Sequence, residues 1–197
     1  MKLLALSIII TLAINFHSFS QNGANIDAIQ KKFNSLTDIY AVFTQYSNGK
    51  EQLSGKFYYK KFDKMRVEST NLLIISDGQT NWNYNEKEKR VVITSFDPED
   101  VSILSLNKLV NDIPPSCNIT KGENGSFILT PKKPGTMNFS KVELTANSDK
   151  LLTNVKITGN DGTLFTIDFT KIQTNQKLSD DFFKFTVKGE TKVVDLR

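Results

Sequence analysis

From residue 38 onward, apolar and polar side chains alternate with a period of two in many short runs. This period is typical of strands that have one buried side and one solvent-facing side. Pairs that favour tight hairpin turns, such as Asn48-Gly49 and Asp77-Gly78, separate the runs. Strands spaced in this way predict an antiparallel meander that curls into a barrel or a deep half-barrel. The runs are 39–46, 53–60, 65–68, 72–76, 81–84, 90–94, 127–130, 140–146, 151–158, 164–172, 183–187 and 192–196.

A helix is predicted just before the first of these strands. Asn25 is a suitable N-cap, and Ile26, Ile29, Phe33 and Leu36 follow at helical spacing on one face. This pattern indicates a short amphipathic helix.

A second helical segment interrupts the strands. Asp97 can cap it, Pro98 suits the first helical position, and Pro114 ends it. A helix that is apolar nearly all round must be buried on several sides or cover an apolar surface. Two interpretations therefore remain open, a core helix that plugs the barrel and a lid over an apolar cavity. The apolar residues are Val101, Ile103, Leu104, Leu106, Leu109 and Val110.

The first 20 residues have the features of a cleavable signal peptide. A lysine precedes an apolar run over residues 3–14, and Ser18 and Ser20 supply small residues at a cleavage site. The run is shorter than the roughly 20 residues that a membrane-spanning helix needs. We expect export to the periplasm, cleavage before Gln21, and a single domain over residues 21–197.

Cysteine content and charge limit the possible partners. Cys117 is the only cysteine, so no internal disulfide can form, and the cleavage site offers no cysteine for a lipid anchor. We therefore expect a mature protein that is not membrane-anchored. The net charge of +4 comes from basic residues scattered among acidic ones, which predicts no nucleic-acid binding.

The residues of ordinary catalytic sites are missing. The single histidine, His17, lies in the predicted signal peptide, so the mature chain lacks the commonest general base and metal ligand. No phosphate loop, dinucleotide fingerprint or nucleophile elbow occurs. The paired carboxylates Glu99-Asp100 and Asp180-Asp181 are more typical of helix caps and solvated charges. We predict a protein that is not an enzyme and needs no cofactor or metal.

Several short motifs follow one another in an order known from one protein family. They are Phe43-Thr44-Gln45, Gly55-Lys56-Phe57-Tyr58-Tyr59-Lys60, Met65-Arg66, Ile75-Ser76-Asp77-Gly78, Trp82 with Tyr84-Asn85, Phe127-Ile128-Leu129-Thr130-Pro131, Phe183-Lys184-Phe185 and Val193-Val194-Asp195. In this order and spacing, over nearly all of the mature chain, they resemble the outer-membrane lipoprotein carrier protein (LolA) family.

The resemblance implies a mainly β fold with helices (α+β), an unclosed antiparallel β-barrel of about eleven strands with an N-terminal helix and a helical lid. It also implies a periplasmic carrier that binds the acyl chains of lipoproteins in a hydrophobic cavity, without catalysis. Such a carrier receives acylated lipoproteins from an inner-membrane ABC transporter and passes them to an outer-membrane receptor. Two alternatives stay open, a carrier of another acyl lipid or glycolipid and a lipid-sensing regulatory domain. We expect a monomer.

Strand alternation nominates the residues of the cavity wall, although core packing is an equal interpretation for each. A register error of one residue would turn the opposite faces inward. The predicted wall residues are Phe43, Phe57, Ile74, Trp82, Val92, Leu129, Leu144, Ile157, Phe165 and Ile167, and the predicted lid residues are Ile103, Leu104, Leu106 and Leu109. The family usually continues after the position of Lys60 with a basic residue and a proline. Here Lys61 and Phe62 follow, so Lys61 and Arg66 are the candidates for rim contacts or a lid latch.

Overall fold

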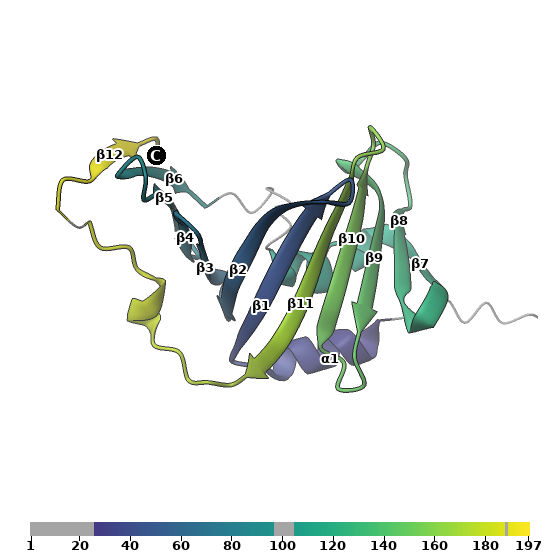
Figure 1. Cartoon of the computed structure of the whole chain (residues 1–197). Helices are drawn as coiled ribbons and strands as arrows, with labels where there is room; N and C mark the ends of the chain where they lie inside the picture. The colour runs from purple at the N-terminus through teal and green to yellow at the C-terminus, as the bar shows by residue number, and fades with distance from the viewer. Residues whose placement is uncertain (1–25, 97–104, 188) are drawn as a thin grey trace, which may run out of the picture.

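The fold is one long, curved and open sheet, seen in a computed structural model that describes residues 26–96, 105–187 and 189–197 (Figure 1). It has 12 strands in the order β12-β6-β5-β4-β3-β2-β1-β11-β10-β9-β8-β7. The two outermost strands, β12 and β7, do not pair with each other, so the sheet does not close. The predicted unclosed barrel with few helices is therefore confirmed, with 12 strands rather than about eleven.

Neighbouring strands are antiparallel except for β12, which runs parallel to β6. The strands are β1 (Asp38–Ser47), β2 (Lys50–Lys60), β3 (Lys64–Ser69), β4 (Leu72–Asp77), β5 (Thr80–Asn85), β6 (Arg90–Ser95), β7 (Cys117–Lys121), β8 (Phe127–Pro131), β9 (Phe139–Ala146), β10 (Leu152–Gly159), β11 (Leu164–Thr174) and β12 (Lys192–Asp195).

The centre of the sheet is formed by β1 with β2 on one side and β11 on the other. These are the longest strands, of 10, 11 and 11 residues. Gly55 on β2 is required by the close approach of β3, because a Cβ atom at this position would collide with the carbonyl oxygen of Glu68. Steric exclusion therefore explains why a glycine stands at this position of the sequence motif.

The ends of the sheet differ from the prediction in two places. Residues 183–187 were predicted as a strand, but Phe183 ends the 3₁₀ turn η4 (Asp180–Phe183) and residues 184–187 follow it without pairing to the sheet. Rings at Phe182, Phe183 and Phe185 instead contact other aromatic rings, which explains the apolar pattern without a strand. Conversely, β7 was missed because it is a short edge strand, in which only Cys117 is buried.

The predicted N-terminal helix is confirmed as α1 (Asp27–Ser35), which buries Ile29 and Phe33. The proposed cap, Asn25, lies outside the described residues. Gln30 ties this helix to the second helical segment, because its side-chain amide donates a hydrogen bond to the carbonyl of Val110 at 2.9 Å.

The second helical segment is described from Ser105 onward. Residues 106–107 begin it, the π-helical turn η1 (Lys108–Asp112) continues it, and the 3₁₀ turn η2 (Pro114–Ser116) leads into β7. Leu106, Leu109, Val110 and Ile113 are buried. The predicted start at Asp97 and Pro98 lies outside the described residues, as do Val101, Ile103 and Leu104.

The remaining turn, η3 (Glu123–Gly125), joins β7 to β8. Within the described ranges, no helix is long and apolar enough to cross a membrane.

Candidate functional site

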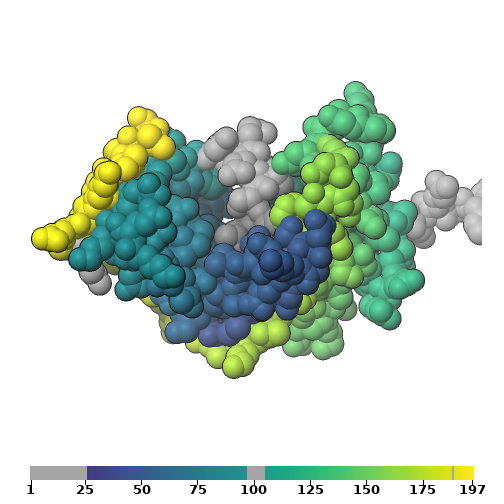
Figure 2. Space-filling model, turned by 45° about the horizontal axis from the view of Figure 1, so that its top comes forward, coloured from purple at the N-terminus to yellow at the C-terminus, as the bar shows by residue number. Residues whose placement is uncertain are grey.

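The strand register assigns each side chain to one of two faces of the sheet, since directly paired residues in antiparallel strands point to the same side. Phe57 on β2 lies opposite Ala41 on β1 and Val67 on β3. These three residues belong to the main buried cluster together with Ile29 and Phe33 of α1. We call this side of the sheet the concave face and the other side the outer face. In Figure 2 the two halves of the sheet, drawn in dark teal and in green, lie on either side of its central strands.

Most of the predicted wall residues share the concave face. Phe43, Phe57, Leu129, Leu144 and Ile167 have 0 % of their surface exposed. Ile157 is also buried, whereas Ile74 and Phe165 are partly buried and pack against the same cluster. Val92 lies at the margin of this face, paired with Asn83, which in turn pairs with Ile74. The structure therefore brings nine of the ten residues to one side, in line with the strand alternation.

Trp82 is the exception, and the prediction that it lies in the same wall is wrong. It pairs with Ile75 on β4 and with Ile93 on β6, both of which point to the outer face. Ile75, Ile93, Val91 and Phe183 are buried there but lie outside the main cluster. Because aromatic residues are frequent on both faces of strands, the ring of Trp82 did not reveal which face is covered.

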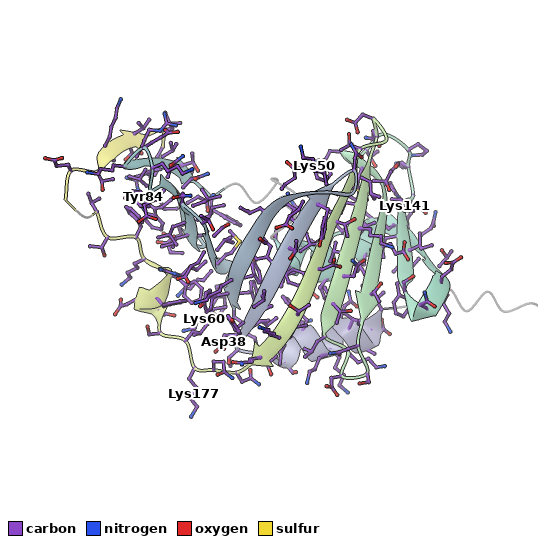
Figure 3. The ribbon with its side chains drawn as sticks, in the orientation of Figure 1. Asp38, Lys50, Lys60, Tyr84, Lys141 and Lys177 are labelled. Carbon is purple, nitrogen blue, oxygen red and sulfur yellow. The ribbon has the colours of Figure 1, made fainter. Side chains whose placement is uncertain are left out.

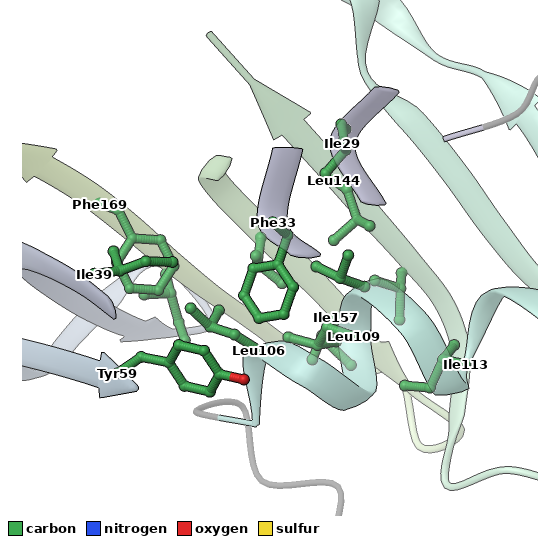
Figure 4. Packing of buried hydrophobic residues seen from close by; sticks show 14 of the residues in the cluster. Ile29, Phe33, Ile39, Tyr59, Leu106, Leu109, Ile113, Leu144, Ile157 and Phe169 are labelled. Atoms are coloured by element: carbon green, nitrogen blue, oxygen red, sulfur yellow. The ribbon is translucent and has the colours of Figure 1, made fainter. Parts of the chain in front are cut away.

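Two short helical segments cover the concave face. The rings of Phe33 on α1 and Tyr59 on β2 lie 5.2 Å apart. Figure 4 shows Leu106 between these two rings, with Leu109 directed toward Ile157. Leu106 and Leu109 are 4 % and 0 % exposed, so the two predicted lid residues that the structure describes do contact the wall.

A pocket of about 420 Å³, counting its opening to solvent, lies between α1, Leu106 and the central strands. Its lining residues are almost all apolar, and the single charged one, Lys150, is an exposed residue of the turn between β9 and β10. Of the predicted residues, only Phe57 and Leu106 line it. The others are Ile29, Phe33, Leu36, Ile39, Ala41, Lys150, Leu151, Leu152, Phe169 and Ile172. The helical spacing had identified Ile29, Phe33 and Leu36 as a packing face but not as part of a site.

At the edge of this cluster, the surroundings disfavour the charged forms of Tyr59 and Asp63. Burial raises the pKa of the Tyr59 hydroxyl, and the carboxylates of Asp63 and Asp112 raise it further. Burial, and then the charge of Asp112, also raises the pKa of Asp63. Residues 26–96, 105–187 and 189–197 contain no group of three side chains that could hold a metal ion. The geometry therefore suits an apolar ligand held by burial.

The predicted latch residues lie elsewhere. Arg66 is on the outer face, where its guanidinium carbon lies 4.6 Å from the ring centroid of Phe182 and its Nη1 donates a hydrogen bond to the Phe182 carbonyl. Its Nε also donates to Glu68 at 2.7 Å. Lys61 is an exposed residue of the turn between β2 and β3. Arg66 thus holds the C-terminal segment (residues 175–197), and it does not face Leu106.

No pattern in the sequence had indicated the residue that anchors the start of this C-terminal segment. Asp38 is 1 % exposed, and its carboxylate accepts hydrogen bonds from the backbone N–H groups of Gln176 and Leu178 at 2.7 and 3.3 Å. Lys60 donates to the Leu178 carbonyl at 2.7 Å and to Asp180 at 2.6 Å. Figure 3 shows Asp38 and Lys60 at the same end of the sheet.

A second depression, of about 520 Å³ with its opening, lies on the outer face. Its lining includes three charged side chains, those of Arg66, Glu68 and Glu86, beside Leu73 and Tyr84. It is less suited to an apolar ligand than the concave face is.

Comparison with known proteins shows which family the chain resembles. The sequence profile described as "Outer membrane lipoprotein carrier protein LolA" matches residues 34–186. The chain is similar to an outer-membrane lipoprotein carrier protein of Francisella tularensis subsp. novicida, with 25% identity and coverage of 99% of this chain and 98% of that protein. A protein of the same description from Hahella chejuensis is 24% identical, with 98% of both chains covered.

The fold is also similar to a solved structure, that of an uncharacterized conserved protein from Thermus thermophilus. The TM-score is 0.55 at 14% sequence identity, and the match covers 86% of this chain and 96% of that one.

Proposed function

Because the chain belongs to the outer membrane lipoprotein carrier protein LolA family, we propose that it binds the acyl chains of lipoproteins against its concave face. Proteins of this family are carriers that bind without catalysis, which confirms the prediction that the chain is not an enzyme. The direction and the route of transport are part of the proposal.

The observation that carries the proposal is the continuous apolar surface of the concave face beneath two short helical segments. Each methylene group exposed to water costs about 0.8 kcal/mol, so a lipid anchor with two or three chains costs tens of kcal/mol to extract unaided. A carrier has to offer an apolar surface of comparable size. The wall from Phe57 through Phe43 and Ile167 to Leu144 is built of such side chains across several strands.

Loading requires the covering segments to move, because Phe33 and Leu106 now occupy the space against the wall. From Ser105 onward, the second segment has few polar links to α1. Besides the hydrogen bond from Gln30, Asn34 and Asn111 exchange two side-chain hydrogen bonds of 3.2 and 3.0 Å. Asn34 is exposed and Asn111 is half-buried, so water can reach these bonds and replace them at small cost. Acyl chains that enter would replace the apolar contacts of the segments with contacts of their own.

The route of the cargo is proposed on the basis of the family. We propose that residues 21–197 act as a single domain in the periplasm after removal of residues 1–20. The carrier would receive acylated lipoproteins from an inner-membrane ABC transporter of the lipoprotein-releasing type and pass them to a receptor at the outer membrane. The cavity wall is proposed to be the predicted set without Trp82, extended by the residues that line the pocket.

A binding experiment tests the proposal. A fluorescent acyl probe should bind the purified mature protein, and a triacylated lipopeptide should displace it. Ala41→Leu, which fills the pocket, should weaken probe binding about tenfold or more. The matched control is Val42→Leu, on the adjacent outward-facing position, which should leave binding unchanged.

Failure of the probe to bind would refute the acyl-carrier function. If a free diacyl lipid displaced the probe as well as the lipopeptide does, the result would favour a carrier of other acyl lipids.

A further inference from the structure

The concave face has two chemically different parts. Across β1, β2 and β8 to β11 it is apolar, but on β5 the alternation is reversed. Asn81 and Asn83 point to the concave face, whereas Trp82 and Tyr84 point to the outer face. Tyr84 contacts Phe185 of the C-terminal segment there, with ring centroids 5.5 Å apart. The C-terminal segment thus accounts for the outward ring of Tyr84, but packing does not account for the inward amides.

The two amides have hydrogen-bonding capacity to spare. Asn83 is exposed and Asn81 is half-buried. Within the described part of the chain, neither side chain makes a hydrogen bond. Asn85, the next residue on the same face, differs because its amide donates to Glu88 and accepts the Glu88 backbone N–H, both at 3.2 Å. Asn85 therefore stabilises the following turn, and only Asn81 and Asn83 are available to a ligand.

The surroundings of these amides are neutral. Asn83 lies between Ile74 and Val92, and Asn81 lies between Ser76 and Thr94. Arg90, at the far end of this face, is paired with Glu88 at 2.7 Å. A phosphate group would find no free cation among these neighbours. The two rings of β5 itself, Trp82 and Tyr84, lie on the other face and cannot stack on a sugar here. The best match is a neutral ligand with alternating donors and acceptors.

An extended peptide backbone has alternating donors and acceptors, and their spacing matches that of the two asparagines. Residues two apart on a strand are separated by about 6.8 Å, and the backbone groups on one side of an extended peptide repeat at the same distance. Each asparagine amide offers both a donor and an acceptor, as does each peptide group. Recognition through the backbone would be independent of the side chains of the cargo.

We propose that Asn81 and Asn83 bind the peptide backbone of the cargo immediately beyond its acylated residue, an inference that rests on the proposed function. From Phe57 on β2 to Asn83 on β5 there are three strand spacings, about 14 Å, which a few extended residues span. The intervening residues, Val67 and Ile74, continue the apolar surface up to the amides. One curved face then holds the acyl chains at its centre and the start of the peptide on β5.

The test compares three short-chain ligands on the mature protein. The first is a diacylglyceryl cysteine amide without a peptide, the second carries five further Ser/Gly residues, and the third carries the same residues with N-methylated backbone amides. The second should bind about tenfold more tightly than the first and the third. Equal affinity of the second and third would overturn the proposal without any variant protein.

The protein-side test is the double variant Asn81→Ala/Asn83→Ala. It should bind the first ligand as the wild type does, and it should lose the roughly tenfold preference for the second. Asn118→Ala, an exposed strand asparagine on the outward side of β7, is the matched control and should keep the preference. A double variant that keeps the preference would overturn the proposal. Failure of the proposed function gives a different result, since then none of the three ligands binds.

Discussion

The ring of Phe33 on α1 lies 5.2 Å from the ring of Tyr59 on β2, at an interplanar angle of 34°. This contact joins the helix that covers the concave face to the wall beneath it. Phe33 is 9% exposed and Tyr59 is 7% exposed, so both belong to the core of the protein. The same side chains line or border the space that a ligand needs, and binding therefore has to replace a part of the core.

Truncation of Phe33 should separate stability from binding. Phe33→Ala should lower the free energy of unfolding by about 3–5 kcal/mol, because it removes a buried ring. Since it also enlarges the pocket, the affinity for an acyl probe should be retained or increased. Chemical denaturation and probe titration measure the two effects. Phe183→Ala, which removes a ring buried on the outer face, is the matched control. It should be similarly destabilising, and a change in its probe affinity would argue against a site confined to the concave face.

Linking the two covering segments should block uptake. In the variant Asn34→Cys/Asn111→Cys, a short bifunctional thiol reagent would hold α1 to η1 where the two amides now exchange hydrogen bonds. The native Cys117 is buried and should not react. The rate of acyl-probe uptake should fall strongly after cross-linking and recover with a cleavable reagent. If the cross-link left uptake unchanged, α1 and η1 would not need to separate for binding.

The buried carboxylate of Asp38 should control the C-terminal segment. Asp38→Ala leaves the N–H groups of Gln176 and Leu178 without their acceptor and should destabilise the protein by about 2–4 kcal/mol. Amide hydrogen exchange should rise first over residues 175–183. Asp38→Asn keeps one acceptor oxygen and should therefore lose less stability than Asp38→Ala. Exchange that rises equally over the whole sheet would contradict a local anchoring role.

Asp180 should contribute to the acid sensitivity of the same segment. Hydrogen bonds from Lys60 and Lys64 lower its pKa to about 2, below the value of roughly 3.9 expected in the unfolded chain. A lowered folded-state pKa stabilises above the unfolded value, so this contribution is present above about pH 4 and is lost as the pH falls toward 2.

The test of this pH dependence is Asp180→Asn, which should flatten the loss of protection over residues 175–183 between about pH 4 and pH 2 at low salt. Asp195, whose pKa Arg197 also lowers to about 2, provides the control. Asp195→Asn should leave the protection of residues 175–183 unchanged. An acid profile that is identical in the wild type and Asp180→Asn would rule out the contribution.

Much of the fold could be predicted because strand periodicity and turn chemistry are local. Phe57, Leu144 and Ile167 were assigned correctly to one face, since each lies in a run with a clear period of two. Trp82 was not, because it shares the outer face with Tyr84, which is covered by Phe185, about 100 residues later in the chain. A period fixes the alternation of a strand but not which of its faces is buried.

The site was only partly predictable for a related reason. Leu106 was identified because its segment is apolar nearly all round. The pocket residues Ala41 and Leu152 carry no local signal, since only the packing of α1 against β1 and β10 brings them together. Asp38 looks like any polar residue at the start of a strand, and its partners lie 138 and 140 positions away.

Acyl binding at the concave face is the central claim, and photo-cross-linking tests it most directly. A lipopeptide with a photoreactive group at the end of one acyl chain would be irradiated with the mature protein, and the modified residues would be located by mass spectrometry. The account predicts modification of residues that line the concave pocket, such as Phe33, Leu106 and Leu152. Modification confined to the outer face around Leu73 and Tyr84 would contradict it.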